Sequence, residues 1–147
     1  MSSKFIGTYE MIINEISIIL QANVKNLKLA SGFSRLVCNF IKERKKGLIN
    51  DQFVYSIELA VSEAVTNAIK FSRKRKFSLH FFVHEVKLII FVKDYGDGFE
   101  LESLREPKFD EFPESGYGLY ILKSQMDQVR YIKNKKWNTL SMTKHFS

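Results

Sequence analysis

The stretch that decides the fold runs from residue 51 to residue 72 and reads DQFVYSIELAVSEAVTNAIKFS. Its apolar residues recur every three or four positions, which is the pattern of a helix with one buried face. Asn50 and Asp51 stand at the start of this pattern, and either side chain can cap the N-terminus of the helix. We therefore predict a long helix that ends at about Ser72 and packs its apolar face against the rest of the protein.

The segments on either side of this helix alternate between helical and strand-like patterns of apolar residues. The expected segments are, in chain order, a helix from Ser3 to Asn14, a strand over 16–22, a helix from about Val24 to Lys46 capped by Gly47, the helix described above, strands Phe77–Val83 and Lys87–Lys93, a helix from Gly118 to about Met126, and strands Val129–Lys133 and Trp137–Thr143. Helices stacked on one face of a mixed, mostly antiparallel sheet are the economical arrangement for that order. We predict an α+β fold, a two-layer α/β sandwich.

The composition is that of one folded domain spanning residues 1–147. Hydrophobic residues make up 45% of the chain and aromatic residues 14%, with thirteen Phe and only two Pro, which excludes a disordered chain. The longest apolar runs, such as Leu88–Val92, are far shorter than the ~20 residues that span a bilayer. The first residues contain no hydrophobic signal-peptide core. We expect a cytoplasmic protein without a membrane span, in which the lone Cys38, among apolar neighbours, is structural.

The charge is distributed unevenly along the chain. The whole chain carries +7, yet residues 94–114 hold eight acidic residues against two basic ones, a net −6, which leaves +13 for the remainder. This pattern indicates an acidic surface loop on a basic body, or simply a loop kept soluble by its charge. Three basic runs fall near expected helix ends and turns, namely 42–46, 73–76 and 133–136. Solvated Lys and Arg gather at such places, so a nucleic acid is not the expected partner.

Glu63 and Asn67 lie four residues apart in the central helix and therefore project from the same face. An ordinary polar pair on a helix surface is one interpretation, but the neighbouring alanines, Ala60, Ala64 and Ala68, leave room for a ligand to approach. The Asn side chain offers a neutral oxygen ligand suited to Mg²⁺. The Glu carboxylate can orient or deprotonate a hydroxyl group.

Two glycine-containing turns follow along the chain. Asp94-Tyr95-Gly96-Asp97-Gly98 comes where an expected strand ends, and its glycines let the backbone approach a ligand closely, although Asp-Gly is also a common turn sequence. Ser115-Gly116-Tyr117-Gly118 opens a helix, where backbone N–H groups and the helix dipole suit a phosphate, although such a turn can merely start a helix. Together with the Glu63–Asn67 pair, in this order, the two turns form a much rarer combination than any one of them.

In this combination the chain resembles the GHKL ATPase superfamily and, within it, the bacterial anti-sigma-factor serine kinases, over about residues 16–143. Ser62–Ala68 resembles their N box and Asp94–Gly98 their first glycine box. Gly116-Tyr117-Gly118, followed by Met126-Asp127 and Val129, resembles their second. The resemblance implies the Bergerat-type ATP-binding fold, with residues 99–114 as the lid over the nucleotide.

The resemblance also implies roles for individual residues. Asn67 would bind the Mg²⁺ that bridges the phosphates of ATP, and Glu63 would be the general base toward the acceptor hydroxyl or a water. Asp94 would accept a hydrogen bond from the exocyclic amine of adenine. The remaining nucleotide-binding residues would be Gly96, Gly98, Ser115, Gly116 and Gly118, with Lys70 as a candidate for offsetting phosphate charge.

The implied function is that of an ATP-dependent serine/threonine protein kinase that sequesters a sigma factor and phosphorylates a Ser-bearing antagonist in a partner-switching system. A homodimer is among the implied assemblies. Sensor histidine kinases share the fold but need a helical segment that carries a phosphorylated His, and the three histidines here, His80, His84 and His145, fall in or beside expected strands. None of them is expected to be a phosphoacceptor.

Two departures from the family pattern favour an alternative. Phe71 stands where these kinases often have His, and Glu114 stands where they often have Arg. An Arg there would offset phosphate charge, whereas a Glu adds to it. The alternative is a catalytically weak, nucleotide-sensing protein-binding module of the same fold.

Overall fold

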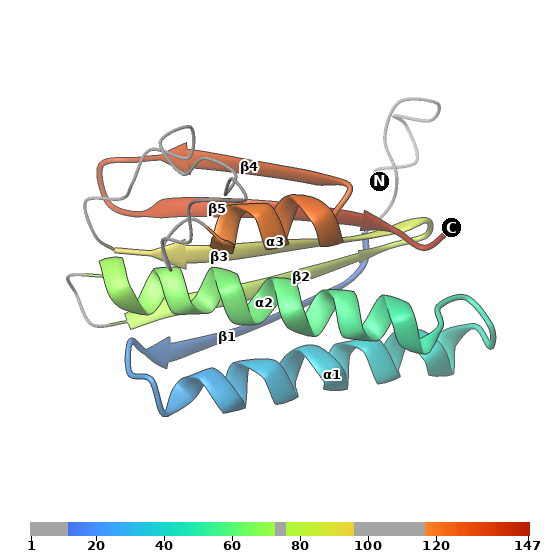
Figure 1. Cartoon of the computed structure of the whole chain (residues 1–147). Helices are drawn as coiled ribbons and strands as arrows, with labels where there is room; N and C mark the ends of the chain where they lie inside the picture. Colours follow the sequence, from blue (N-terminus) through green and yellow to red (C-terminus); the bar gives the residue numbers. More distant parts are fainter. Residues whose placement is uncertain (1–11, 73–75, 96–116) are drawn as a thin grey trace, which may run out of the picture.

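The computed structural model describes residues 12–72, 76–95 and 117–147. Its elements are, in chain order, β1 (Ile12–Gln21), α1 (Asn26–Arg44), α2 (Asp51–Phe71), β2 (Lys76–His84), β3 (Lys87–Asp94), α3 (Tyr117–Gln125), β4 (Gln128–Lys133) and β5 (Asn138–His145). In these residues the strands form one sheet in the order β1-β2-β3-β5-β4, with antiparallel pairing throughout. The helices cover one face of that sheet (Figure 1). The predicted α+β sandwich is confirmed, although the described strands form an antiparallel rather than a mixed sheet.

The helix predicted from Ser3 to Asn14 is wrong at its C-terminal end, because β1 already begins at Ile12. Residues 1–11, which would contain the rest of that helix, lie outside the described residues. From Ile12 to Gln21, β1 pairs with β2, with a shift of register between Ile12 and Asn14. Backbone hydrogen bonds to a strand more than fifty residues away therefore impose the extended form, and a local pattern of apolar residues does not encode them.

The central helix α2 begins as predicted. The side-chain oxygen of Asn50 accepts a hydrogen bond from the N–H of Phe53 at 2.8 Å, which satisfies a donor that has no partner within the first turn. The preceding helix α1 ends at Arg44, and Gly47 adopts a positive φ of 82° in the turn between the two helices, a conformation that favours glycine. None of α1, α2 and α3 combines the length and the apolar character that crossing a membrane requires.

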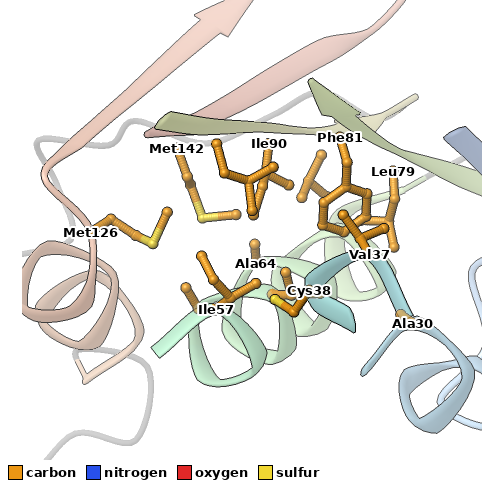
Figure 2. Packing of buried hydrophobic residues seen from close by; sticks show 14 of the residues in the cluster. Ala30, Val37, Cys38, Ile57, Ala64, Leu79, Phe81, Ile90, Met126 and Met142 are labelled. Carbon is orange, nitrogen blue, oxygen red and sulfur yellow. The ribbon is translucent and has the colours of Figure 1, made fainter. Parts of the chain in front are cut away.

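The hydrophobic core lies between the sheet and the helices (Figure 2). Alternate residues of the central strand β3 face the helices, and Leu88, Ile90 and Val92 are buried there. Asp94 is the next residue in this alternation, at the last position of β3. The fold therefore directs a carboxylate toward the helix layer at one end of the core.

Candidate functional site

Glu63, Asn67 and the start of α3 lie close together. Both side chains project from one face of α2, as their spacing predicts, and α3 packs beside α2 (Figure 1). A Cβ atom placed on Gly118, in the first turn of α3, would lie 3.3 Å from Oε2 of Glu63 and 3.6 Å from Nδ2 of Asn67. The absence of a side chain at Gly118 therefore lets the beginning of α3 approach both polar groups closely. One residue of the second glycine turn is thus brought to the Glu63–Asn67 pair.

The carboxyl group of Glu63 is partly buried, and this burial raises its pKa above the ordinary value for glutamate. A carboxylate with a raised pKa takes up a proton more readily than an exposed one, which is the property that a general base toward a hydroxyl group needs. Asn67 is also partly buried and presents an amide oxygen one turn further along α2. The pair can therefore supply a proton acceptor and a neutral oxygen ligand side by side.

Asp94 lies at the end of the sheet where α2 ends, because it pairs with Phe77 in β2, the strand that follows α2 in the chain. Asp94 is only 3% exposed, and its Oδ1 accepts a hydrogen bond from Nδ2 of Asn138 at 3.0 Å. Asn138 is 2% exposed and stands directly opposite Asp94 in the β3–β5 pairing. The amide thus holds the carboxylate in one orientation, which makes Asp94 a fixed hydrogen-bond acceptor.

Asn138 is a candidate site residue that the sequence reasoning missed. It lies 44 positions from Asp94 in the chain, and no local motif marks it. The single signal is its polarity at the core-facing positions of β5, where the next two, Leu140 and Met142, are buried and apolar. That signal becomes informative only when the register of β5 against β3 is known.

Of the predicted site residues not yet discussed, Lys70 lies within the described part of the chain and the others lie outside it. Lys70 is exposed, and its ammonium group lies 5.5 Å from the centroid of the Phe71 ring, a cation–π contact. The remaining predicted residues and the lid fall outside the described residues, namely Gly96, Gly98, Ser115, Gly116 and 99–114. Their predicted roles stay predictions.

Cys38 is fully buried in α1, in agreement with its predicted structural role. Burial raises the pKa of its thiol to about 12, so the group is protonated at neutral pH and is not a nucleophile. In the described part of the chain, no cluster of three or more His, Cys, Asp or Glu side chains could hold a metal ion by itself. Mg²⁺ does not require such a cluster when phosphates and waters supply most of its ligands, so the amide oxygen of Asn67 fits an ion that arrives with a nucleotide.

Comparison with known proteins identifies the family to which this chain belongs. Residues 34–144 match the family described as the histidine kinase-like ATPase domain. The chain is 31% identical to the serine-protein kinase RsbW of Bacillus subtilis (strain 168) over 128 residues, which cover 79% of this chain and 78% of that relative. It is 36% identical to the serine-protein kinase RsbW of Staphylococcus aureus (strain bovine RF122 / ET3-1) over 101 residues, which cover 60% of this chain and 63% of that relative.

A solved structure shares the fold. The structure of the RsbU and RsbW domains of Rv1364c from Mycobacterium tuberculosis matches 89% of this chain and 31% of its own length, with a TM-score of 0.62. The sequence identity is 13%, so this likeness concerns the architecture alone. It agrees with the α+β architecture described above.

Proposed function

Because the chain belongs to the histidine kinase-like ATPase family and, within it, to the anti-sigma-factor serine kinases of the RsbW type, we propose that it transfers the γ-phosphoryl group of ATP to a serine of an antagonist protein. In this reaction the serine oxygen attacks the γ-phosphorus, the bond to the departing ADP breaks, and Glu63 accepts the serine proton. The same chain would sequester a sigma factor. Phosphorylation of the antagonist would then determine which of the two partners stays bound.

One observation carries this proposal: the approach of the first turn of α3 to Glu63 and Asn67. The N-terminus of a helix favours phosphate, because its N–H groups lack partners and its dipole is positive at that end. A Cβ at Gly118 would lie 3.3 Å from Oε2 of Glu63, so this end comes close to a carboxylate whose pKa is raised by burial. A phosphate site beside a proton acceptor is the arrangement that phosphoryl transfer to a hydroxyl group needs.

We propose further that Asn67 would hold Mg²⁺ through its amide oxygen and that Asp94 would select adenine. When bound, the ion would neutralise charge on the phosphates. Asp94, held by Asn138, would accept a hydrogen bond from the exocyclic amine of the base. These two residues lie on different elements, α2 and β3, so the nucleotide would extend from the end of β3 to the start of α3.

Replacing Asn67 by Ala should weaken the binding of MgATP by about 10- to 100-fold, the loss that corresponds to one contact with a charged group. The affinity for ATP measured without Mg²⁺ should change much less. Isothermal titration with ATP, with and without Mg²⁺, measures both values. Equal loss in both titrations would show that Asn67 does not act through the ion.

Thr66→Ala is the matched control for this titration. Thr66 is the exposed neighbour of Asn67 on α2, and its hydroxyl donates a hydrogen bond to the carbonyl of Ser62 within the same helix. Its replacement should leave the affinity for MgATP unchanged.

Binding of MgATP by the wild-type protein, without transfer to a Ser-bearing antagonist, would favour the nucleotide-sensing module over the kinase.

We also propose a homodimer through the face of the sheet opposite α1, α2 and α3 (Figure 1). Ile19 on the edge strand β1 is 68% exposed, and Ile132 on the opposite edge strand β4 is 50% exposed. Both point away from the helices, and the cross-strand register places them in one row across the sheet. Between the two edges, the rings of Phe82 and Phe91 pack edge to face at 4.9 Å. The face therefore presents one exposed isoleucine at each edge and an aromatic pair between the edges.

A second copy fits this face because the pattern is self-complementary. Rotation by 180° about an axis parallel to the strands would bring β1 of each copy over β4 of the other. Ile19 would then contact Ile132 on β4 of the second copy, which stands in the same row. Glu15 would lie near the oppositely charged Arg130 of the second copy, because the rows of Glu15 and Arg130 are adjacent in the register. Because of the two-fold symmetry each contact occurs twice, so the interface would contain two Ile19–Ile132 contacts and two Glu15–Arg130 charge pairs.

Sedimentation measurements test this assembly. We expect the wild-type protein to sediment as a dimer at micromolar concentrations. The variant Ile19→Lys/Ile132→Lys should sediment as a monomer, because lysines of like charge would face each other at both contacts across the interface. Leu36→Lys, which changes a side chain 64% exposed on α1, is the control and should remain a dimer. A monomeric wild type, or dissociation of the control, would contradict this interface.

A further inference from the structure

Lys144 joins the two helices that carry the candidate site. It lies on the helix-facing side of β5, and its ammonium group donates a hydrogen bond to the backbone carbonyl of Gln125, the last residue of α3, at 2.8 Å. The same ammonium group lies 5.8 Å from the centroid of the Phe53 ring, in the first turn of α2. A positive charge at the C-terminus of a helix and above an aromatic ring is favourable in both positions.

The C-terminal end of α3 has a second attachment to β5. Just after the helix, the N–H of Asp127 donates to the carbonyl of Thr143 at 2.8 Å. The side chain of Asp127 strengthens this attachment, because its Oδ2 accepts a hydrogen bond from the N–H of His145 at 2.7 Å and lies 3.1 Å from Nδ1 of the same residue. These bonds all meet at one residue beyond the helix, so together they act as a pivot about which a short helix can still turn. The bond from Lys144 to Gln125 holds the helix at a different residue and so restricts that rotation.

The opposite end of α3 lies against Glu63 and Asn67. A Cβ on Gly118 would be only 3.3 Å from Oε2 of Glu63, so the two elements come close at this position and a side chain there would be crowded. The nine residues of α3 span about 13 Å, and a tilt of about 10° at the C-terminal pivot would move the N-terminal end by about 2 Å. A small change of orientation at Lys144 is therefore amplified at the other end of the helix.

We propose that Lys144 is a positioning residue for nucleotide binding: by anchoring the C-terminus of α3 between β5 and the start of α2, it sets the distance between the start of α3 and the Glu63–Asn67 pair. This inference rests on the proposed function in one respect, namely that the nucleotide phosphates bind at the start of α3. Lys144 itself contacts neither the nucleotide nor the transferred group.

Three variants separate positioning from general stability. Lys144→Met keeps the aliphatic stem beside Phe53 but removes the ammonium group, whereas Lys144→Arg retains a charged donor. Lys123→Met removes a charge from an exposed lysine in the same last turn of α3 and is the matched control. The position of α3 is measured without nucleotide by the NMR chemical shift of the Gly118 amide. Nucleotide binding is measured as the dissociation constant of MgATP, and catalysis as kcat and KM.

We expect Lys144→Met to shift the Gly118 amide resonance and to weaken MgATP binding about ten-fold, within the range for residues that act on a site without touching the ligand. The same change should appear in KM, with kcat altered less, and Lys144→Arg should restore both. Lys123→Met should match the wild type. An unshifted Gly118 resonance in Lys144→Met would overturn the inference, as would a wild-type affinity in a variant that is only less heat-stable.

The proposed function and this inference fail in different ways. If the wild-type protein does not bind MgATP, the proposed function is wrong, while the Gly118 resonance still reports whether Lys144 positions α3. If the wild type binds MgATP and Lys144→Met binds it equally well, the inference is wrong and the proposed function stands.

Discussion

A chain in which Glu63 is replaced by Gln should transfer phosphate about 10²- to 10⁴-fold more slowly than the wild type, the usual contribution of a general base. The amide has nearly the size of the carboxylate, so the close approach of α3 at Gly118 and the affinity for MgATP should change little. What the amide lacks is the ability to accept the serine proton. The measurement is ADP formation in the presence of a Ser-bearing antagonist, with a Ser→Ala antagonist as the blank. Equal turnover by both proteins would contradict the role of Glu63.

The same variant should be more resistant to heat than the wild type at neutral pH. Burial raises the pKa of Glu63 in the folded state above its value in the unfolded chain, so the folded state holds this proton more tightly. The contribution of this group to stability is therefore present below the unfolded pKa and is lost as the pH rises through the folded pKa. Gln has no such ionisation. We expect the two unfolding temperatures to converge in acid and to separate toward neutral pH, and a less stable Gln variant at neutral pH would contradict this sign.

Replacing Asp94 by Asn should weaken ATP binding by about 100-fold or more, because a buried hydrogen bond to a charged acceptor is lost and a donor is placed against another donor. Nδ2 of Asn138 donates to one carboxylate oxygen of Asp94. A new amide at position 94 would turn its own oxygen toward that donor. Its NH₂ group would then face the exocyclic amine of adenine, where no hydrogen bond can form.

This geometry predicts a change in base preference as well as in affinity. Guanine carries an oxygen acceptor where adenine carries the amine. Asp94→Asn should therefore weaken the binding of ATP more than the binding of GTP, which lowers the ratio of ATP to GTP affinity. Asn138→Ala is the companion variant, since it removes the donor and keeps the carboxylate. It should weaken ATP binding less and leave the preference for ATP intact. Competition titrations with both nucleotides measure these values, and an unchanged ATP to GTP ratio in Asp94→Asn would contradict the assigned contact.

Several features were predictable because they depend on short-range interactions. The amphipathic spacing of α2 and its Asn50 cap act within one or two helical turns, so the helix was found almost to the residue. The same holds for β2 and β3, whose limits extend the predicted strands by one residue at most ends. The order of the three polar motifs along the chain was enough to indicate the family, and the match of residues 34–144 confirmed it.

Other features depend on which distant segments meet. Ile12 to Asn14 are extended because β1 pairs with β2, although their local pattern suited a helix. Asn138 became a candidate site residue through the register of β5 against β3, which places its amide on Asp94. Gly118, predicted only as a phosphate-binding turn residue, also sets how closely α3 approaches Glu63.

The sequence by itself determined the central helix, the side chains it presents on one face and the class of reaction they suit, because residues three and four apart on a helix become neighbours whatever surrounds them. Only the tertiary structure decided which groups hold Asp94, how near α3 lies to the helix pair and how Lys144 anchors that helix. Those contacts form between elements far apart in the chain, where sheet register and core packing, rather than local preference, set the distances.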